Sequence, residues 1–224
     1  MGLLREEDRA YLEDLFAKSL VKPVKIVYFT QALNCQFCED TKMIYEEVAS
    51  LHSDIHLEVH NFAEEKDLAQ QYGIDKVPGA AIVTDEKDYG VRFFGIPSGY
   101  EFMSLVEAIV HVSKGTVELE PETIEKLKTI TRPVHIEVMV TPTCPYCPRM
   151  VMLAHKFAIV SDMIRADMVE ATEFPELANK YAVYGVPKTM INGGHGIEGA
   201  VPEHVFLDHL MASLEEEGSK IIRP

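Results

Sequence analysis

The stretches Cys35-Gln36-Phe37-Cys38 and Cys144-Pro145-Tyr146-Cys147 contain all four cysteines of this 224-residue chain. They lie 109 residues apart, and the same offset relates residues further along the chain. The matching residues are Glu64, Leu68, Ala69, Tyr72, Val77 and Pro78 in the first half and Glu173, Leu177, Ala178, Tyr181, Val186 and Pro187 in the second. A repeat of residue types at one offset indicates a duplicated structural unit. We therefore predict two domains, at residues 1–116 and 117–224.

The composition predicts a folded, water-soluble protein. Hydrophobic residues make up 47% of the chain and charged residues 25%, which is ordinary for globular proteins. The net charge of -15 argues against non-specific binding to nucleic acid or to anionic membranes, because both require a basic surface. Asn and Gln number only four each, which is typical of thermophile proteins. The chain has no apolar stretch like that of a signal peptide or membrane span, so we expect a cytoplasmic location.

Hydrophobic periodicity and turn residues predict an α/β fold in which both halves have the same order of elements. In the first half we expect a helix at 5–20, strand at 24–30, helix at 35–52, strand at 55–62, helix at 64–72, hairpin strands at 79–84 and 90–95, and helix at 100–112. In the second half we expect a helix at 121–130, strand at 133–140, helix from 144, strand at 163–169, helix at 173–182, strands at 188–192 and 196–199, and helix at 203–216. Asn34 is the expected N-cap of the helix that begins at Cys35.

Close cysteine pairs in a reducing cytosol are more often catalytic or metal-binding than structural. A cysteine at the start of a helix lies beside unpaired backbone N–H groups, which favour its thiolate and lower its pKa. Cys35 and Cys144 are therefore candidate nucleophiles. Cys38 and Cys147 follow one helical turn later, within reach to resolve a mixed disulfide. Pro148 removes one helical hydrogen bond, which predicts a local kink.

A strand, a Cys-x-x-Cys pair at the start of a helix and a later Val-Pro step before a hairpin resemble the thioredoxin superfamily. This pattern occurs twice, and together the two occurrences cover essentially the whole chain. Two tandem units with intact cysteine pairs, the second reading Cys-Pro-Tyr-Cys, are most similar to the protein disulfide oxidoreductases of thermophilic archaea and bacteria. The resemblance implies two thioredoxin-like folds, each a central mixed sheet flanked by helices. It also implies a protein that oxidises, reduces or isomerises protein disulfides without a cofactor of its own.

The resemblance further assigns roles to individual residues. It makes Cys35 and Cys144 the attacking cysteines and Cys38 and Cys147 the resolving ones. It implies that Pro78 and Pro187 are cis prolines facing the cysteines, where Val77 and Val186 complete a substrate-docking edge. Disulfide-containing or dithiol proteins are the substrates that this arrangement implies.

The chain also departs from thioredoxin itself. It contains no Trp, whereas thioredoxins usually carry one just before the first cysteine. Thioredoxins also have a buried acid in the strand that enters the motif. Glu137, seven residues before Cys144, is the candidate here, and Tyr28 holds that position in the first half. Glu137 is therefore a candidate proton relay for Cys147, and the alternative is a solvated glutamate at the strand edge.

The second half resembles glutaredoxin as well, in Cys-Pro-Tyr-Cys and in residues 184–194, which makes glutathione use an alternative. The basic residue that glutaredoxins place before the cysteine pair is absent, because residues 140–143 carry no charge. The adjacent glycines Gly193 and Gly194 are also explained by a simple hairpin turn.

Other classes of protein have to be considered. The two pairs could hold one structural zinc, although zinc sites of this type usually separate their pairs by about 15–20 residues. A chaperone-like module could bind unfolded chains and make little use of the cysteines. Neither half contains the glycine motif of a flavin or nicotinamide site, so we predict a separate flavoprotein of the thioredoxin-reductase type as electron donor. We expect no metal.

Overall fold

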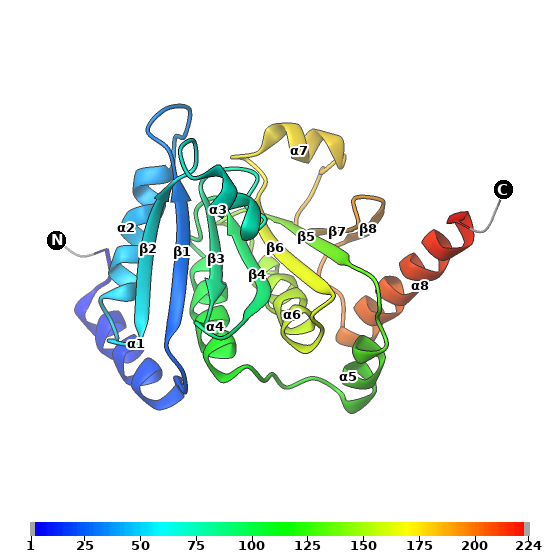
Figure 1. The fold of residues 1–224 in the computed structure, drawn as a ribbon, viewed down its shortest axis with the longest axis horizontal. Helices are drawn as coiled ribbons and strands as arrows, with labels where there is room; N and C mark the ends of the chain where they lie inside the picture. Colours follow the sequence, from blue (N-terminus) through cyan, green and yellow to red (C-terminus); the bar gives the residue numbers. More distant parts are fainter. Residues whose placement is uncertain (1–2, 222–224) are drawn as a thin grey trace.

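The computed structural model describes residues 3–221, and a single sheet of eight strands runs through both halves (Figure 1). The strands of the first half are β1 (Val24–Thr30), β2 (Ile55–Asn61), β3 (Gly79–Val83) and β4 (Asp88–Phe94). Those of the second half are β5 (Val134–Val140), β6 (Ile164–Glu170), β7 (Lys188–Ile191) and β8 (His195–Glu198). The order across the sheet is β2-β1-β3-β4-β6-β5-β7-β8, so each half contributes four strands in the same arrangement.

The two halves join where β4 pairs with β6. These strands run parallel, with Val91 opposite Ala166 and Phe94 opposite Val169. Within each half, the first strand is central and pairs in parallel with the second strand and antiparallel with the third. Each half is therefore a mixed sheet, as predicted. The pairing of β4 with β6 also covers one sheet edge of each half, which would otherwise expose unpaired backbone groups.

Helices cover both faces of the sheet. One face carries α1 (Glu6–Ser19), α2 (Cys38–Ala49), α4 (Glu101–Lys114), α5 (Pro121–Lys128), α6 (Cys147–Val160) and α8 (Glu203–Ile221). The other face carries α3 (Lys66–Gln71) and α7 (Pro175–Lys180). None of the helices in residues 3–221 is both long enough and apolar enough to span a bilayer. The same order of elements occurs in both halves, as the sequence repeat predicts.

Strand alternation divides the apolar side chains between the two faces. In β1, Ile26 and Tyr28 belong to the larger apolar cluster, together with residues of α2 and α6, whereas Val27 and Phe29 belong to the smaller cluster beside α3. The larger cluster contains buried residues from both halves. The two helices that carry the cysteine pairs therefore pack on the same face of one continuous core.

The helices of the cysteine pairs begin later than the sequence predicts. The helix α2 starts at Cys38 and α6 starts at Cys147, so Cys35 and Cys144 precede the first helical turn. The first cysteine of each pair thus lies in the loop that follows the central strand of its half. It still lies close to the free N–H groups of the helix start.

Two local expectations near these helix starts are wrong. Asn34 is not the N-cap of α2, because its φ of 58° is left-handed and Phe37 holds the N-cap position. Pro148 lies in the first turn of α6, where its missing N–H has no helical partner in any case. No turn of helix precedes it, so the predicted kink does not arise.

Glycines of the first half allow close contact with the second. Gly90 has a φ of +78°, and a Cβ atom there would lie 2.5 Å from the carbonyl oxygen of Ile164. Gly95 has a φ of +87°, and its Cβ would lie 2.5 Å from the Cβ of Glu170 and 2.8 Å from Oε1 of Glu173. Any side chain at these positions would push the halves apart and would also favour a different backbone conformation.

Replacing Gly90 by alanine is therefore expected to destabilise the protein by about 2 kcal/mol. A left-handed backbone alone costs a non-glycine residue roughly 1–2 kcal/mol, and the carbonyl of Ile164 must also move. Gly194→Ala is a matched control, because a Cβ atom at Gly194 would meet no neighbour within 4 Å and its φ is not left-handed. Denaturant unfolding measures both free energies. Equal stability of the two variants would contradict a role for Gly90 in joining the halves.

Candidate active site

Each cysteine pair forms a disulfide bond between its own two residues. Disulfide bonds join Cys35 to Cys38 and Cys144 to Cys147, with 5.5 Å between the Cα atoms in each. Cys35 is partly exposed and Cys144 is 8% exposed, whereas Cys38 and Cys147 are 2% and 0% exposed. In both pairs the first cysteine is therefore the more accessible, as a nucleophile that has to meet a protein substrate requires.

The Sγ atom of Cys144 lies between two backbone groups. The N–H of Cys147 donates to this sulfur at 3.2 Å. The carbonyl oxygen of Val186 lies 3.7 Å from the same sulfur. The N–H donor is placed to stabilise the negative charge that this sulfur carries when the disulfide is reduced. The contact with Val186 brings the predicted docking edge directly beside the predicted attacking sulfur.

The Val77–Pro78 and Val186–Pro187 peptide bonds are both cis, as predicted. Both prolines are buried, and their carbonyl oxygens accept hydrogen bonds from the N–H groups of Gly95 and Gly199 at 2.9 Å. These bonds tie each proline to the hairpin of its own half. The valine before each proline is only partly buried and lies just before the hairpin strand.

A buried tyrosine supports the first cysteine pair. The hydroxyl of Tyr28 donates to the backbone oxygen of Cys38 at 2.7 Å, and its ring packs against Tyr45 with 5.1 Å between centroids. Burial raises the pKa of Tyr28, so the hydroxyl keeps its proton and remains a donor. The structure therefore links the central strand β1 to the first residue of α2 through this side chain.

The residue that corresponds to Tyr28 in the second half is Val138, and Glu137 corresponds to Val27. The reason is that β1 begins at Val24 and β5 at Val134, and each of these pairs with the first residue of the next strand. The central strands therefore match at an offset of 110, whereas the cysteines match at 109. One additional residue between β1 and Cys35 accounts for the difference.

This shift of one position turns Glu137 to the other face of the sheet. Its neighbours Ile136 and Val138 pack in the cluster that contains Cys147 and the rest of α6. Strand alternation directs Glu137 toward the face that carries α7. A proton relay from Glu137 to Cys147 therefore has no support in the geometry. The alternative of a solvated glutamate is wrong, because Glu137 is 5% exposed.

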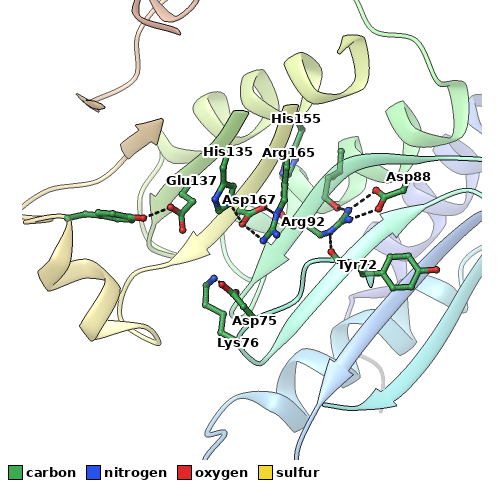
Figure 2. A network of polar contacts seen from close by, with 12 residues as sticks. Tyr72, Asp75, Lys76, Asp88, Arg92, His135, Glu137, His155, Arg165 and Asp167 are labelled. Atoms are coloured by element: carbon green, nitrogen blue, oxygen red, sulfur yellow. Dashed lines mark hydrogen bonds and ion pairs between the residues drawn. The ribbon is translucent and has the colours of Figure 1, made fainter. Parts of the chain in front are cut away.

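Glu137 instead belongs to the buried polar cluster in Figure 2. The hydroxyl of Tyr181 donates to its carboxylate at 2.5 Å. Asp167 lies opposite Glu137 in the sheet and receives hydrogen bonds from His135 at 2.6 Å and from Arg165 at 2.7 and 2.8 Å. Although burial acts to raise it, these bonds hold the pKa of Asp167 well below its usual range. Both buried carboxylates of the cluster thus have hydrogen-bond donors within it.

Side-chain ligand atoms of His135, Glu137 and Asp167 lie within 4.8 Å of one another, a spacing that suits a metal ion. The carboxylates, however, already accept hydrogen bonds from Arg165 and Tyr181. A cation would have to displace the Arg165 guanidinium, so this donor set fits a structural role better than a metal site. The cysteines do not converge on a shared zinc either, because each pair is closed within its own half.

Sequence reasoning missed the buried Glu101 and the partly buried Glu173. Burial raises the pKa of Glu101 to about 7. The neighbouring Tyr100 donates its backbone N–H to the carbonyl of Pro142 at 3.0 Å, which places the start of α4 against the loop that leads to Cys144. Burial and the charge of a nearby glutamate also raise the pKa of Glu173 to about 7. Neither residue lies in a motif, so the sequence does not distinguish them from surface glutamates.

Comparison with known proteins is consistent with this geometry. A family model described as a thioredoxin domain matches residues 134–212. The solved structure of a protein disulfide oxidoreductase from Aeropyrum pernix is 34% identical, has a TM-score of 0.86 and covers 95% of this chain and 94% of its own. The structure of the alkylhydroperoxide reductase AhpF from Enterococcus faecalis is 30% identical, with a TM-score of 0.86, and covers 92% of this chain and 99% of that one.

Among curated proteins, an NADH dehydrogenase of Ferdinandcohnia aciditolerans is 27% identical over 177 residues, which are 79% of this chain and 32% of the relative. The chain therefore spans about a third of the length of the curated relatives that it matches. Most of the length of these relatives is therefore unmatched.

Two thioredoxin-like units in one sheet, each with its own cysteine pair and cis proline, define a tandem member of the thioredoxin superfamily. With the extent of the match to the Aeropyrum pernix structure, the chain belongs to the family of protein disulfide oxidoreductases. This confirms the resemblance that the sequence suggested.

The burial of the cysteines predicts their order of alkylation after reduction. Iodoacetamide should label Cys35 first and Cys144 next, while Cys38 and Cys147 react about tenfold more slowly or less, because their sulfurs are buried. Mass spectrometry of digests taken at intervals measures each rate. The same reaction in denaturant is the control, since all four rates should then converge. Rapid native labelling of Cys38 or Cys147 would contradict the assignment of attacking and resolving cysteines.

Proposed function

We propose that the protein catalyses thiol–disulfide exchange with protein substrates through both cysteine pairs. The observation that carries this proposal is the position of the Cys144 sulfur, which lies between the N–H of Cys147 and the carbonyl of Val186. One group stabilises the sulfur after reduction, and the other belongs to the edge where an extended substrate would pair. We assign the corresponding role to Cys35 and Cys38, with Val77 and Pro78, because the sequence repeat matches them to the residues of the second pair.

In the reducing direction, the thiolate of Cys144 attacks one sulfur of a substrate disulfide. A mixed disulfide forms, and the other substrate sulfur leaves as a thiolate. The thiolate of Cys147 then attacks the Cys144 sulfur, which closes the Cys144–Cys147 disulfide and releases the second substrate thiolate. Two electrons pass from the cysteine pair to the substrate, and the reverse sequence oxidises a dithiol. The direction follows from the relative reduction potentials of the partners.

The docking edge is the second part of the proposal. We assign substrate binding to Val77, Pro78, Val186 and Pro187, because backbone next to a reactive sulfur can pair with an extended segment as an added strand does. The burial of both prolines and their hydrogen bonds to the hairpins support this assignment, because they hold the valines in a fixed position. We place one such site in each of the proposed domains, 1–116 and 117–224.

Reduction of insulin by dithiothreitol tests the exchange reaction. A variant with all four cysteines replaced by serine should lose catalysis completely. The Cys35→Ser, Cys38→Ser variant and the Cys144→Ser, Cys147→Ser variant should each retain part of it. Thermal unfolding of the variants is compared with that of the reduced wild-type protein, which also lacks the disulfides. This control shows whether the loss of the disulfides alone lowers stability. If the four-serine variant accelerates insulin reduction by dithiothreitol as much as the wild type does, the proposal is contradicted. Slower precipitation of the insulin chains, with no acceleration by either protein, would favour the chaperone-like alternative.

We infer that electrons reach the cysteine pairs from a nicotinamide by way of a flavoprotein of the thioredoxin-reductase type. The matching relatives are named NADH dehydrogenase and alkyl hydroperoxide reductase, which supports a link of this region to such a chain of carriers. The net charge of -15 favours a partner with a basic docking face.

Nicotinamide oxidation in a mixture of this protein, insulin and a thioredoxin-reductase-type flavoprotein measures the coupling. The rate should fall as salt is raised from low to physiological ionic strength, since the screening length shortens to about 8 Å. The four-serine variant is the control for nicotinamide oxidation that does not pass through the cysteine pairs of this protein. If the flavoprotein reduces neither cysteine pair while dithiothreitol reduces both, the proposed donor is wrong.

A further inference from the structure

A cavity of about 590 Å³ lies where the two halves meet, beside the first cysteine pair. Its wall includes Phe37, which stands between Cys35 and Cys38, and Pro142, which precedes Cys144 by two residues. The remaining lining comes mainly from α2, from the segment between β4 and α4, and from the segment that follows β6. A substrate held at the cysteine pairs would therefore lie next to this cavity.

The side walls of the cavity are apolar. Met43 and Ile44 of α2 form one side, and Ile96 and Phe102 form another. Met43 is 44% exposed, so the cavity reaches the protein surface on the side of α2. These side chains offer contact to an aliphatic or aromatic group that enters from solvent.

Two carboxylates of the second half also line the cavity. Glu170 is 1% exposed, and its Oε2 accepts hydrogen bonds at 2.7 Å from the hydroxyl of Thr172 and from the N–H of Glu173. Its other oxygen, Oε1, is buried and has no hydrogen-bond partner among the described residues. A buried carboxylate oxygen without a donor is unfavourable, so this oxygen is suited to a ligand that brings one.

Glu173 adds a second acceptor at the same place. Its Oε1 accepts the N–H of Ile96 at 2.6 Å, and the absence of a side chain at Gly95 permits this approach. The lining also contains Asp40 and Glu47 and no lysine, arginine or histidine among the residues that the structure describes. Arg9 balances Glu47 at 2.6 Å. The cavity therefore has an excess of acidic side chains, and no basic side chain among the residues that line it pairs with them.

We propose that this cavity binds a lysine or arginine side chain of the protein substrate, close to the cysteine that reacts. The aliphatic stem of such a side chain matches the apolar walls, and its charged end supplies the N–H donors that Glu170 and Glu173 can accept. The inference rests on the proposed function, because thiol–disulfide exchange is what brings a polypeptide to this edge. It adds a preference for basic residues near the substrate cysteine.

Binding of peptides without cysteine tests the inference separately from the redox chemistry. Calorimetry would compare an extended peptide that carries one lysine with the same peptide carrying norleucine, which keeps the stem and lacks the charge. The lysine peptide should bind about tenfold more tightly to the wild type, as expected for a charge-assisted hydrogen bond to a buried acceptor. Glu170→Gln and Glu173→Gln should each remove most of this preference.

Glu64→Gln is the matched control, because Glu64 is the counterpart of Glu173 in the sequence repeat and is exposed outside the cavity. It should leave the preference unchanged. Since Glu173 is only partly buried, its variant remains informative if Glu170→Gln does not fold. Equal binding of the lysine and norleucine peptides to the wild type would overturn the inference.

Two further measurements separate the possible failures. Free n-butylamine that binds as tightly as the lysine peptide would indicate a small-amine site and overturn the assignment to a substrate side chain. Insulin turnover by the wild type without any peptide preference would overturn the inference and leave the proposed function standing. A lysine preference without turnover would support the cavity assignment and contradict the proposed function.

Discussion

The pairing of β4 with β6 is the constraint that organises both halves of this protein. Residues 91–94 and 166–169 form a parallel ladder, so the two thioredoxin-like units share one sheet and one large apolar cluster. The ladder fixes the second cysteine pair relative to the first. It also brings Glu170 and Glu173 against Gly95 and Ile96, and Ile96, Glu170 and Glu173 line the cavity beside the first pair.

Buried polar side chains lie close to this ladder, and one of them joins the two halves. Arg92 is 3% exposed, and its guanidinium donates to the carboxylate of Asp88 and to the carbonyl of Tyr72 (Figure 2). His155 of α6 contacts the carbonyl of Arg92 at 3.3 Å. Burial lowers the pKa of His155 to about 4, so this side chain is neutral and introduces no unpaired charge. A slip of the ladder would separate the buried His155 from the Arg92 carbonyl, and leaving a buried polar group without its partner is unfavourable.

The duplication has produced two sites with the same chemistry and different surroundings. The hydroxyl of Tyr28 donates a hydrogen bond to the backbone oxygen of Cys38 in the first pair. Val138 holds the corresponding position in the second half and has no hydroxyl to donate. Cys35 is also more exposed than Cys144. The acidic cavity lies beside the first pair, so the surroundings of the two cysteine pairs differ.

The duplication, the two cysteine pairs and the order of elements could be predicted from the sequence, because they follow from repeated residue types and from local periodicity. The resemblance to a known family implied the cis prolines. The face of Glu137 could not be predicted, since one additional residue before Cys35 shifts the match of the central strands. Tertiary packing also joined β4 to β6 and placed the buried Glu170 and the partly buried Glu173 beside the first cysteine pair. The pairing of β4 with β6 and the positions of Glu170 and Glu173 depend on packing between segments that are distant in the sequence. No local sequence signal encodes such contacts.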